Sequence, residues 1–329
     1  MATVTTEERY LSLLVEPIKR CSSYKPKFGT TGSGVSLDQF RELYEEDPLY
    51  TWVGLNSPLM YAAHKAAGGM TSIYRQLGIG CERLLRQIIR DQLSLTEEQV
   101  LWEYKYEKSG GRGAGDDGDE LADADDDNSD QDELEPVDGS SAPSTASVGA
   151  SADQSNSGKF GIHKLDARIQ VSDIQDEARR AIVNQWILKT ASDLGLPTER
   201  AQQLKGVVFE IRQGYKSADS KRQNADLRFG VRSYNENYLP VICIVSTQAS
   251  ETVCTRYRAA QILVLRGKRT MSDDNTFAFF KDVVQFDLAG FFERNSARIR
   301  KDFERVLAKL LSPDESSSTA ILEAVVKAG

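Results

Sequence analysis

Histidine is scarce in this chain of 329 residues. Only His64 and His163 occur, about a hundred residues apart. Such a distribution argues against a zinc centre, a histidine-based nuclease site or any His-rich metal cluster, because these need several imidazole or thiolate ligands close together. A phosphate-binding GxxxxGK[ST] loop is also absent, since the Gly-rich stretch at 29–34 has no Lys and no preceding strand. If this chain is an enzyme, its catalysis must therefore use carboxylates and lysines.

Cysteines are few, and none of the four forms a CxxC pair. Cys81, Cys243 and Cys254 lie in apolar stretches, which is typical of reduced, packed thiols in a cytosolic protein. No run approaches the ~18 apolar residues of a membrane helix. The first residues lack the basic-then-apolar layout of a signal peptide. We therefore expect a cytoplasmic protein with no membrane partner.

Acidic side chains outnumber basic ones in the whole chain, but the excess comes from one segment. The net charge is −8, yet residues 113–158 hold fourteen acidic side chains and no Lys or Arg. The rest of the chain carries 41 basic and 35 acidic side chains, a net charge of +6. A weakly basic body with a separate acidic tract suits a nucleic-acid binder better than the whole-chain charge suggests.

Composition divides the chain into four parts. Residues 1–108 predict a helical region that contributes a helix and a strand to the core, and 159–312 predict the α/β core itself. Between them, 109–158 predict a disordered acidic linker, because this segment has almost no bulky apolar residue to bury. It is either a solvated linker or an autoinhibitory DNA mimic. Residues 313–329 form a C-terminal tail that we expect to be partly helical.

Hydrophobic periodicity predicts the elements in each part. The first part shows helical patterns over 1–24, 37–48, 57–67 and 71–93, with a break at Gly68-Gly69, and a strand over 99–107. The α/β part shows helices at 172–194, 218–236, 250–259, 275–284 and 288–311, alternating with strands at 206–216, 239–246 and 261–266. This alternation predicts an α/β (α+β) fold with a mixed central sheet flanked by helices. Trp52, Trp102 and Trp186 are expected in the core.

The strand predicted at 206–216 is the most informative segment. Alternation along it separates apolar Val207, Phe209 and Ile211 from a second face with Val208, Glu210, Arg212 and Lys216. A dense polar group follows: Asp219, Lys221, Arg222, Asn224 and Asp226. Charge gathered directly after a buried strand is unusual, because ordinary surface charge is scattered. The alternative is a solvated helix start capped by Ser217 or Asp219.

These residue types fit metal-assisted phosphodiester hydrolysis. Carboxylates hold Mg²⁺ through hard oxygen ligands, and the ion polarises a phosphate and activates water. A nearby Lys can orient that water or stabilise developing charge. The literal D/E-x-K triplet is Asp219-Ser220-Lys221, and a strand-borne variant is Glu210-Ile211-Arg212, with Lys216 as a replacement amine. The strand position favours Glu210, while the literal match favours Asp219 and Lys221.

The block GYKSADSKRQNAD at 214–226, together with segments 71–89, 238–258 and 262–267, resembles the ApaLI-type restriction endonucleases. The resemblance covers most of the chain outside the acidic linker. It implies a PD-(D/E)XK, restriction-endonuclease-like core, and a type II enzyme that cuts both strands of DNA at a short palindromic site with Mg²⁺. It also implies a homodimer that works alongside a DNA methyltransferase. The resemblance transfers site roles to Glu210, Lys216, Asp219, Lys221 and Arg222.

Further candidates lie outside this block. Glu82, in the helix at 71–93, is a candidate metal ligand, because several such nucleases take a Glu from the first core helix; the alternative is an exposed Glu beside Arg83 and Arg86. Gln248 follows a strand and either contacts DNA or caps the strand end. Arg298 and Lys301 belong to a basic helix that either lines a DNA backbone channel or is a solvated face.

The resulting hypothesis assigns a role to each residue. Glu210 and Asp219 bind Mg²⁺, with Glu82 as a further ligand. Lys216 or Lys221 acts on water and charge, and Arg212, Arg222, Asn224, Gln248, Arg298 and Lys301 contact DNA. One alternative is a DNA-binding protein without catalysis, in which 206–230 is only a phosphate clamp. Another is a repair or scaffold protein whose acidic tract recruits a basic partner.

Overall fold

The computed structural model describes residues 5–28, 34–107, 160–215, 220–270, 272–314 and 317. The acidic linker expected at 109–158 therefore lies outside the described residues, as does nearly all of the expected C-terminal tail. In the described part of the chain, none of the helices combines the length and apolar composition needed to span a bilayer.

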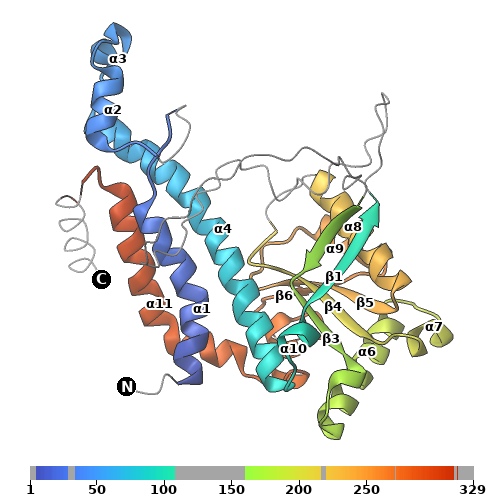
Figure 1. Ribbon diagram of the computed structural model, residues 1–329. Coiled ribbons are helices and arrows are strands. Elements are labelled where there is room, and N and C mark those ends of the chain that lie inside the picture. Colours follow the sequence, from blue (N-terminus) through green and yellow to red (C-terminus); the bar gives the residue numbers. More distant parts are fainter. Residues whose placement is uncertain are drawn as a thin grey trace, which may run out of the picture.

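A mixed four-stranded sheet forms the centre of the α/β part, in agreement with the fold class expected from the sequence (Figure 1). Its strands are β3 (Ala167–Gln170), β4 (Gly206–Arg212), β5 (Tyr238–Ile244) and β6 (Leu263–Arg266), in that order. β3 runs antiparallel to β4, whereas β4, β5 and β6 are parallel. β1 (Trp102–Glu107) and β2 (Phe160–Leu165) form a separate antiparallel ribbon.

Two crossover helices join the parallel strands and cover one face of the sheet. α8 (Ser220–Asn235) connects β4 to β5, and α9 (Glu251–Ala259) connects β5 to β6. Phe229 of α8 and Tyr257 of α9 are buried with Val208 of β4. The face that carries Val208 also carries Glu210 and Arg212, because strand side chains alternate. The alternation predicted for 207–212 is thus confirmed, but the strand ends at Arg212 and not at 216, and Lys216 lies outside the described residues.

Helices cover the opposite face of the sheet. Val207, Phe209 and Ile211 of β4 pack there with side chains of α4 (Pro58–Gln92) and α6 (Glu177–Asp193). α10 (Thr276–Asp282) closes the same core, and α1 (Thr6–Arg20) and α11 (Leu288–Leu311) pack beside α4 (Figure 1). Short helical segments connect these elements: η1 (Cys21–Ser23), α5 (Glu97–Val100), η2 (Val171–Asp173) and α7 (Thr198–Gln202).

The helix break expected at Gly68-Gly69 does not exist. α4 runs without interruption from Pro58 to Gln92. Gly69 instead faces α11, where an added Cβ would lie 2.5 Å from Leu310 Cδ2. Glycine in mid-helix costs up to about 1 kcal/mol in helix propensity, but close packing between α4 and α11 offsets that cost. The break expected from the low helix propensity of glycine is therefore wrong, because Gly69 lies where α4 packs against α11.

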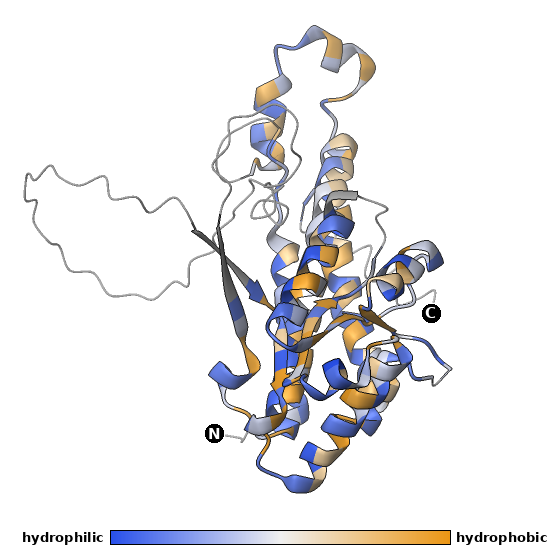
Figure 2. Cartoon of the chain, turned by 90° about the vertical axis from the view of Figure 1, so that its right-hand side faces the viewer, coloured by the Kyte–Doolittle hydropathy of each residue, from blue (hydrophilic) through white to orange (hydrophobic). Residues whose placement is uncertain are grey.

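One end of the helical layer projects away from the sheet (Figures 1 and 2). It consists of α2 (Leu37–Tyr44), α3 (Pro48–Val53) and the start of α4. Trp186 and Trp102 pack against the core, as expected, but Trp52 is 81% exposed. The core position expected for Trp52 is wrong because α3 buries none of its residues.

Candidate active site

A bend at Asp166 creates the most unusual feature of the sheet. The chain leaves β2 at Leu165 and enters β3 at Ala167, with Asp166 in the bend between them. Ala167 pairs with Phe209 of antiparallel β4, so the same register sets Asp166 opposite Glu210. Two carboxylates therefore meet near the carboxyl end of β4, where parallel β5 runs alongside.

Asp166 is held in place by two hydrogen bonds that involve different parts of the residue. The Ile211 amide donates to the Asp166 carboxylate Oδ2 at 2.6 Å. The Arg86 Nε donates to the Asp166 backbone carbonyl oxygen at 2.5 Å. Burial and the nearby Glu210 charge raise the pKa of the Asp166 carboxyl well above its usual range, although the Ile211 amide and two arginines act in the opposite direction. Burial is the largest cause of this shift, and the two arginines offset it only in part.

Arg212 joins Glu210 to a second carboxylate on α8. Its Nη2 lies 3.1 Å from Glu210 Oε1 and 2.7 Å from Asp226 Oδ1. Only 11% of the Arg212 side chain is exposed. Burial alone would lower the pKa of the Arg212 guanidinium, but Glu210 and Asp226 outweigh burial and raise it. Arg212 is thus permanently charged and holds Glu210 in position instead of exchanging protons.

Two tyrosines support the Arg212–Asp226 pair from the side of α9. The Tyr257 hydroxyl donates to Asp226 Oδ2 at 2.7 Å, and the Tyr215 hydroxyl lies 2.6 Å from the Tyr257 hydroxyl. The Arg212 guanidinium also lies 5.8 Å from the Tyr215 ring centroid, a cation–π distance. Burial and the Asp226 charge raise the pKa of Tyr257. Both hydroxyls remain protonated at neutral pH and available to hold Asp226.

Among the described contacts, Glu82 is connected to the carboxylate pair only indirectly, through Arg86. It forms an i,i+4 ion pair with Arg86 on α4, and Arg86 donates to Asp166. Among the described residues, no group of three or more His, Cys, Asp and Glu side chains is arranged to hold a metal ion. The role of Glu82 as a metal ligand remains a prediction, and Arg86 neutralises its carboxylate in this structure.

The loop after β4 and the end of β5 bring Gln248 close to the site. The Tyr215 amide donates to the Gln248 backbone carbonyl at 2.5 Å. An added Cβ on Gly214 would lie 2.8 Å from Gln248 Oε1, so the two segments pass close to each other at this point. On α8, Asn224 accepts a hydrogen bond from Arg256 at 3.1 Å, and Arg222 is exposed. Gln248 thus contacts the loop that follows β4, and Arg222 and Asn224 lie near the start of α8, while their contacts with DNA remain predictions.

Other predicted residues are either undescribed or distant. Lys216 and Asp219 lie outside the described residues, as does the side chain of Lys221. Arg298 and Lys301 lie on α11, which packs against α1 and α4. Arg298 is paired with Glu8 of α1 at 2.6 Å. The structure therefore does not bring Arg298 and Lys301 to the carboxylate pair.

Sequence reasoning missed Asp166, Arg86, Tyr215 and Tyr257. The strands at 160–170 were not predicted, because they are short and adjoin the acidic segment. A signal was present in Leu165-Asp166-Ala167-Arg168-Ile169, where a single Asp starts a short alternating run. Such a run can indicate an edge strand with a carboxylate at its start. The pairing of Asp166 with Glu210 required the register, which no local pattern gives.

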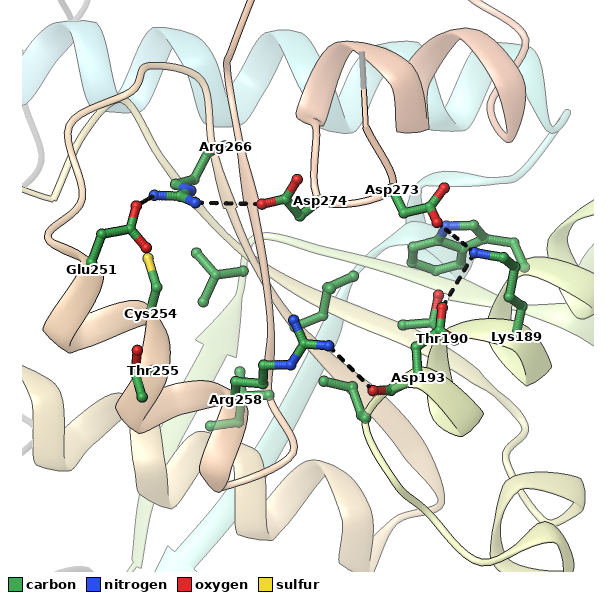
Figure 3. Close-up of a pocket in the computed structure, with 15 residues that line it drawn as sticks. Lys189, Thr190, Asp193, Glu251, Cys254, Thr255, Arg258, Arg266, Asp273 and Asp274 are labelled. Carbon is green, nitrogen blue, oxygen red and sulfur yellow. Dashed lines mark hydrogen bonds and ion pairs between the residues drawn. The ribbon is translucent and has the colours of Figure 1, made fainter. Parts of the chain in front are cut away.

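A cavity of about 610 Å³ lies elsewhere, at the open edge of the sheet beside β6 (Figure 3). α6 and α9 flank it, and its charged side chains are largely satisfied by one another. Lys189 lies 2.6 Å from Asp273, and Arg266 lies 3.4 Å from Asp274 (Figure 3). Neither Asp166 nor Glu210 lines this cavity. The carboxylate pair, not this cavity, is the better candidate for catalysis.

Cysteine chemistry plays no part in the site. All four cysteines are free; Cys21, Cys81 and Cys243 are buried, and Cys254 is partly exposed in the cavity beside β6. Burial raises the pKa of the Cys81 and Cys243 thiols to about 12. These two thiols are therefore inert packing groups at neutral pH, as the sequence indicated.

The chain was also compared with known protein families, curated proteins and solved structures. No family profile matches it, and neither does any curated protein or solved structure.

Proposed function

We propose that this protein is a Mg²⁺-dependent endonuclease that cuts both strands of duplex DNA at a short specific site. The observation that carries the proposal is the placement of Asp166 opposite Glu210 near the carboxyl end of β4. Two carboxylates that converge at the end of a central strand, with Asp166 buried close to the Glu210 charge, are suited to a divalent cation and a phosphate. The polar block at 214–226 begins directly after this strand.

The donor set fits Mg²⁺ better than a transition metal. Mg²⁺ is usually bound through one or two carboxylates, with water and substrate phosphate oxygens completing its ligands. Asp166 and Glu210 supply two carboxylates, so a third acidic side chain is not required. When bound, the ion would supply polarisation of the scissile phosphodiester and activation of water. Asp219, expected as a ligand from the sequence, would add to this set.

The chain's own residues would do the remaining work. Arg212, held by Asp226 and the tyrosine pair, fixes the orientation of Glu210. Lys216 or Lys221 would orient the attacking water or stabilise the charge that develops on the phosphate. Exposed Arg222 at the start of α8 would contact the DNA backbone, and Asn224 and Gln248 would assist it.

The arrangement of elements supports a restriction-endonuclease-like core. One carboxylate lies on β4 and the other in the bend just before antiparallel β3, a helix crossover leads to a parallel third strand, and α4 carries Glu82. The strand-borne triplet is Glu210-Ile211-Arg212, with Arg where this motif has Lys. The resemblance to ApaLI-type enzymes points the same way and adds a palindromic site, a homodimer, a methyltransferase partner and a cytoplasmic location to the proposal.

Digestion of a plasmid of known sequence tests the proposal. Incubation with Mg²⁺ should give discrete fragments with uniform ends, and EDTA should abolish cleavage. Binding without cutting would favour a protein that uses residues 206–230 only as a phosphate clamp. If the protein neither binds nor cuts DNA, then DNA is not its substrate. Cleavage that survives EDTA would exclude a role for Mg²⁺.

A further inference from the structure

Another hollow, of about 350 Å³, lies at the base of the arm, which we define as α2, α3 and the start of α4. Its walls come from the segment after α1, the start of α2, the first turns of α4 and the end of α11 (Figure 1). Lys65 lines it, whereas Arg86 contacts Asp166. Both belong to α4, at a separation of about 32 Å given the ~1.5 Å helical rise per residue. The hollow is therefore separate from the candidate active site.

Positive charge dominates the lining of this hollow, which we call the basic pocket. Lys25, Lys65 and Lys309 line it together with one acidic residue, Asp314, which gives a net charge of +2. Lys65 donates a hydrogen bond to the backbone carbonyl that directly follows α11, at 3.2 Å. Lys25 and Lys309 have neither an ion-pair partner nor a hydrogen-bond partner among the described residues. Their two ammonium groups are therefore available to a ligand.

Ion pairing along the neighbouring seam between α1 and α11 stops where the basic pocket begins. Arg294 and Arg298 of α11 pair with Glu7 and Glu8 of α1. Lys309 follows Arg298 by about three full helical turns, so both side chains lie on the same side of α11. In the described part of the chain, no acidic side chain pairs with Lys309 as Glu8 pairs with Arg298. The positive charge at the pocket is thus left without the neutralisation that the seam provides.

Hydrogen bonds hold the walls of the pocket in place. The Val35 amide donates to the Pro26 carbonyl at 2.8 Å, and the Tyr61 hydroxyl of α4 donates to the Val35 carbonyl at 2.9 Å. The Ser22 hydroxyl has no partner among the described residues, so it is available as a donor. Leu37 and Tyr61 add apolar surface to the lining. The pocket therefore combines ammonium, hydroxyl and apolar groups on a fixed frame.

We propose that the basic pocket binds the phosphate group of a small phosphorylated molecule. A phosphate monoester carries about −1.5 to −2 charges at neutral pH, which complements the net charge of +2 on the lining. Lysine is a common phosphate ligand, because its ammonium donates charge-assisted hydrogen bonds to phosphate oxygens. A volume of about 350 Å³ is near the lower end of the range for ligand sites. It leaves room for one phosphate and a small organic group, which would lie against Leu37 and Tyr61.

The charge of the arm favours a compact ligand over a DNA backbone. Residues 36–60 carry five acidic side chains and one basic side chain, a net charge of −4. This stretch begins at the wall of the pocket, because Ser36 and Leu37 line it. A duplex laid across the pocket would bring a row of phosphates toward the acidic arm and be repelled, whereas a single phosphate would stay among the lysines. The inference does not depend on the proposed nuclease activity.

Calorimetric titration of the full chain with phenyl phosphate, without Mg²⁺ or DNA, tests the proposal. The wild type should bind one molecule per chain. Lys25→Gln and Lys309→Gln should each raise the Kd at least about 10-fold, the effect of losing one hydrogen bond to a charged group. Because neither lysine contacts another described residue through a polar bond, both variants should melt like the wild type.

Two controls separate a built phosphate site from general attraction of anions. Lys281→Gln removes an exposed lysine on α10, outside the pocket, and this variant should bind phenyl phosphate like the wild type. Phenyl sulfate has nearly the same shape as phenyl phosphate but carries a single negative charge. It should bind the wild type at least about 10-fold more weakly, because it offers less charge to the two lysines.

Several results would overturn the proposal: a wild type that does not bind phenyl phosphate, equal affinity for phenyl sulfate, normal binding by both pocket variants, or an equal loss in Lys281→Gln. A different outcome would assign the pocket to DNA. In that case Lys25→Gln and Lys309→Gln would each reduce the salt slope of duplex binding by roughly one unit, and phenyl phosphate would not bind. A protein that binds phenyl phosphate but does not cut DNA would keep this inference and refute only the proposed function.

Discussion

Asp166 is the residue on which the carboxylate pair most directly depends. Its pKa is raised by burial and by Glu210, so the folded protein binds a proton there more readily than the unfolded chain, in which an Asp titrates near about 3.9. Stability therefore falls as pH rises from that unfolded value to the raised folded pKa, and the full cost is present above it. In the absence of divalent ions, ionised Asp166 destabilises the fold.

The Asp166→Asn variant tests this consequence. The Asn carbonyl oxygen can still accept the Ile211 amide, while the repulsion from Glu210 is lost. We expect a melting temperature at pH 7.5 in EDTA at least about 2 °C above wild type, with the difference shrinking as pH is lowered toward 4. Asp193→Asn is the control, because Asp193 is 53% exposed beside Lys189 and should show no such gain. A lower melting temperature for Asp166→Asn at pH 7.5 would contradict the account.

Tyr257 donates a hydrogen bond to a buried charge and also contacts the Tyr215 hydroxyl. Tyr257→Phe removes the donor that Asp226 accepts at 2.7 Å, and hydrogen bonds to charged groups contribute about 1.5–3 kcal/mol. Tyr238→Phe removes a bond to the neutral Gln170 side chain, for which about 0.5–1.5 kcal/mol is expected. Urea unfolding of both variants checks the order. Equal losses would mean that Asp226 is satisfied without the tyrosine.

Lys216 and Lys221 should differ in kind. Lys216→Ala should lower single-turnover cleavage with little change in DNA affinity, since its amine acts on charge present only in the transition state. Lys221→Ala should weaken binding and reduce the salt slope by roughly one unit, as loss of a phosphate contact does. Binding in Ca²⁺ over a salt series separates the two. If Lys221→Ala stops turnover while keeping affinity and slope, the triplet Asp219-Ser220-Lys221 is the active one.

At the scale of the element, helix α4 is shaped by its glycines. An added Cβ on Gly80 would lie 2.6 Å from the Leu14 backbone carbonyl of α1, whereas one on Gly78 would meet nothing within 4 Å. Gly80→Ala should therefore destabilise the protein by about 1–3 kcal/mol as α1 is pushed away. Gly78→Ala should stabilise it by up to about 1 kcal/mol through helix propensity. Chemical denaturation measures both; a neutral Gly80→Ala would show that α1 can shift freely.

Elements with strong periodicity could be predicted, and those defined by packing could not. The face of β4 that carries Glu210 followed from alternation, and α11 was expected at its observed bounds of 288–311. β3 has only four residues, which is too short for a reliable pattern, so Asp166 remained hidden until its register with β4 was known. The exposed Trp52 and the uninterrupted α4 were also missed. In both cases the outcome depends on contacts between distant segments.

At the scale of the whole molecule, the acidic tract should be separable from the fold. Residues 113–158 have almost no apolar side chains able to pack, so their deletion should leave cooperative melting intact. Calorimetry of the shortened chain provides the check, and a large loss of cooperativity would refute it. The same chain tests autoinhibition. Faster cleavage at low salt would favour DNA mimicry, while an unchanged rate would leave only a linker.

The central claim is that Asp166 and Glu210 act together as the catalytic carboxylate pair of a Mg²⁺-dependent endonuclease. Single-turnover cleavage of a specific duplex by Asp166→Asn, Glu210→Gln and the control Asp193→Asn tests it most directly. We predict that the first two variants lose at least about 100-fold in rate, while binding DNA in Ca²⁺ like the wild type, and that Asp193→Asn remains fully active. Wild-type rates in either Asp166→Asn or Glu210→Gln would contradict the claim.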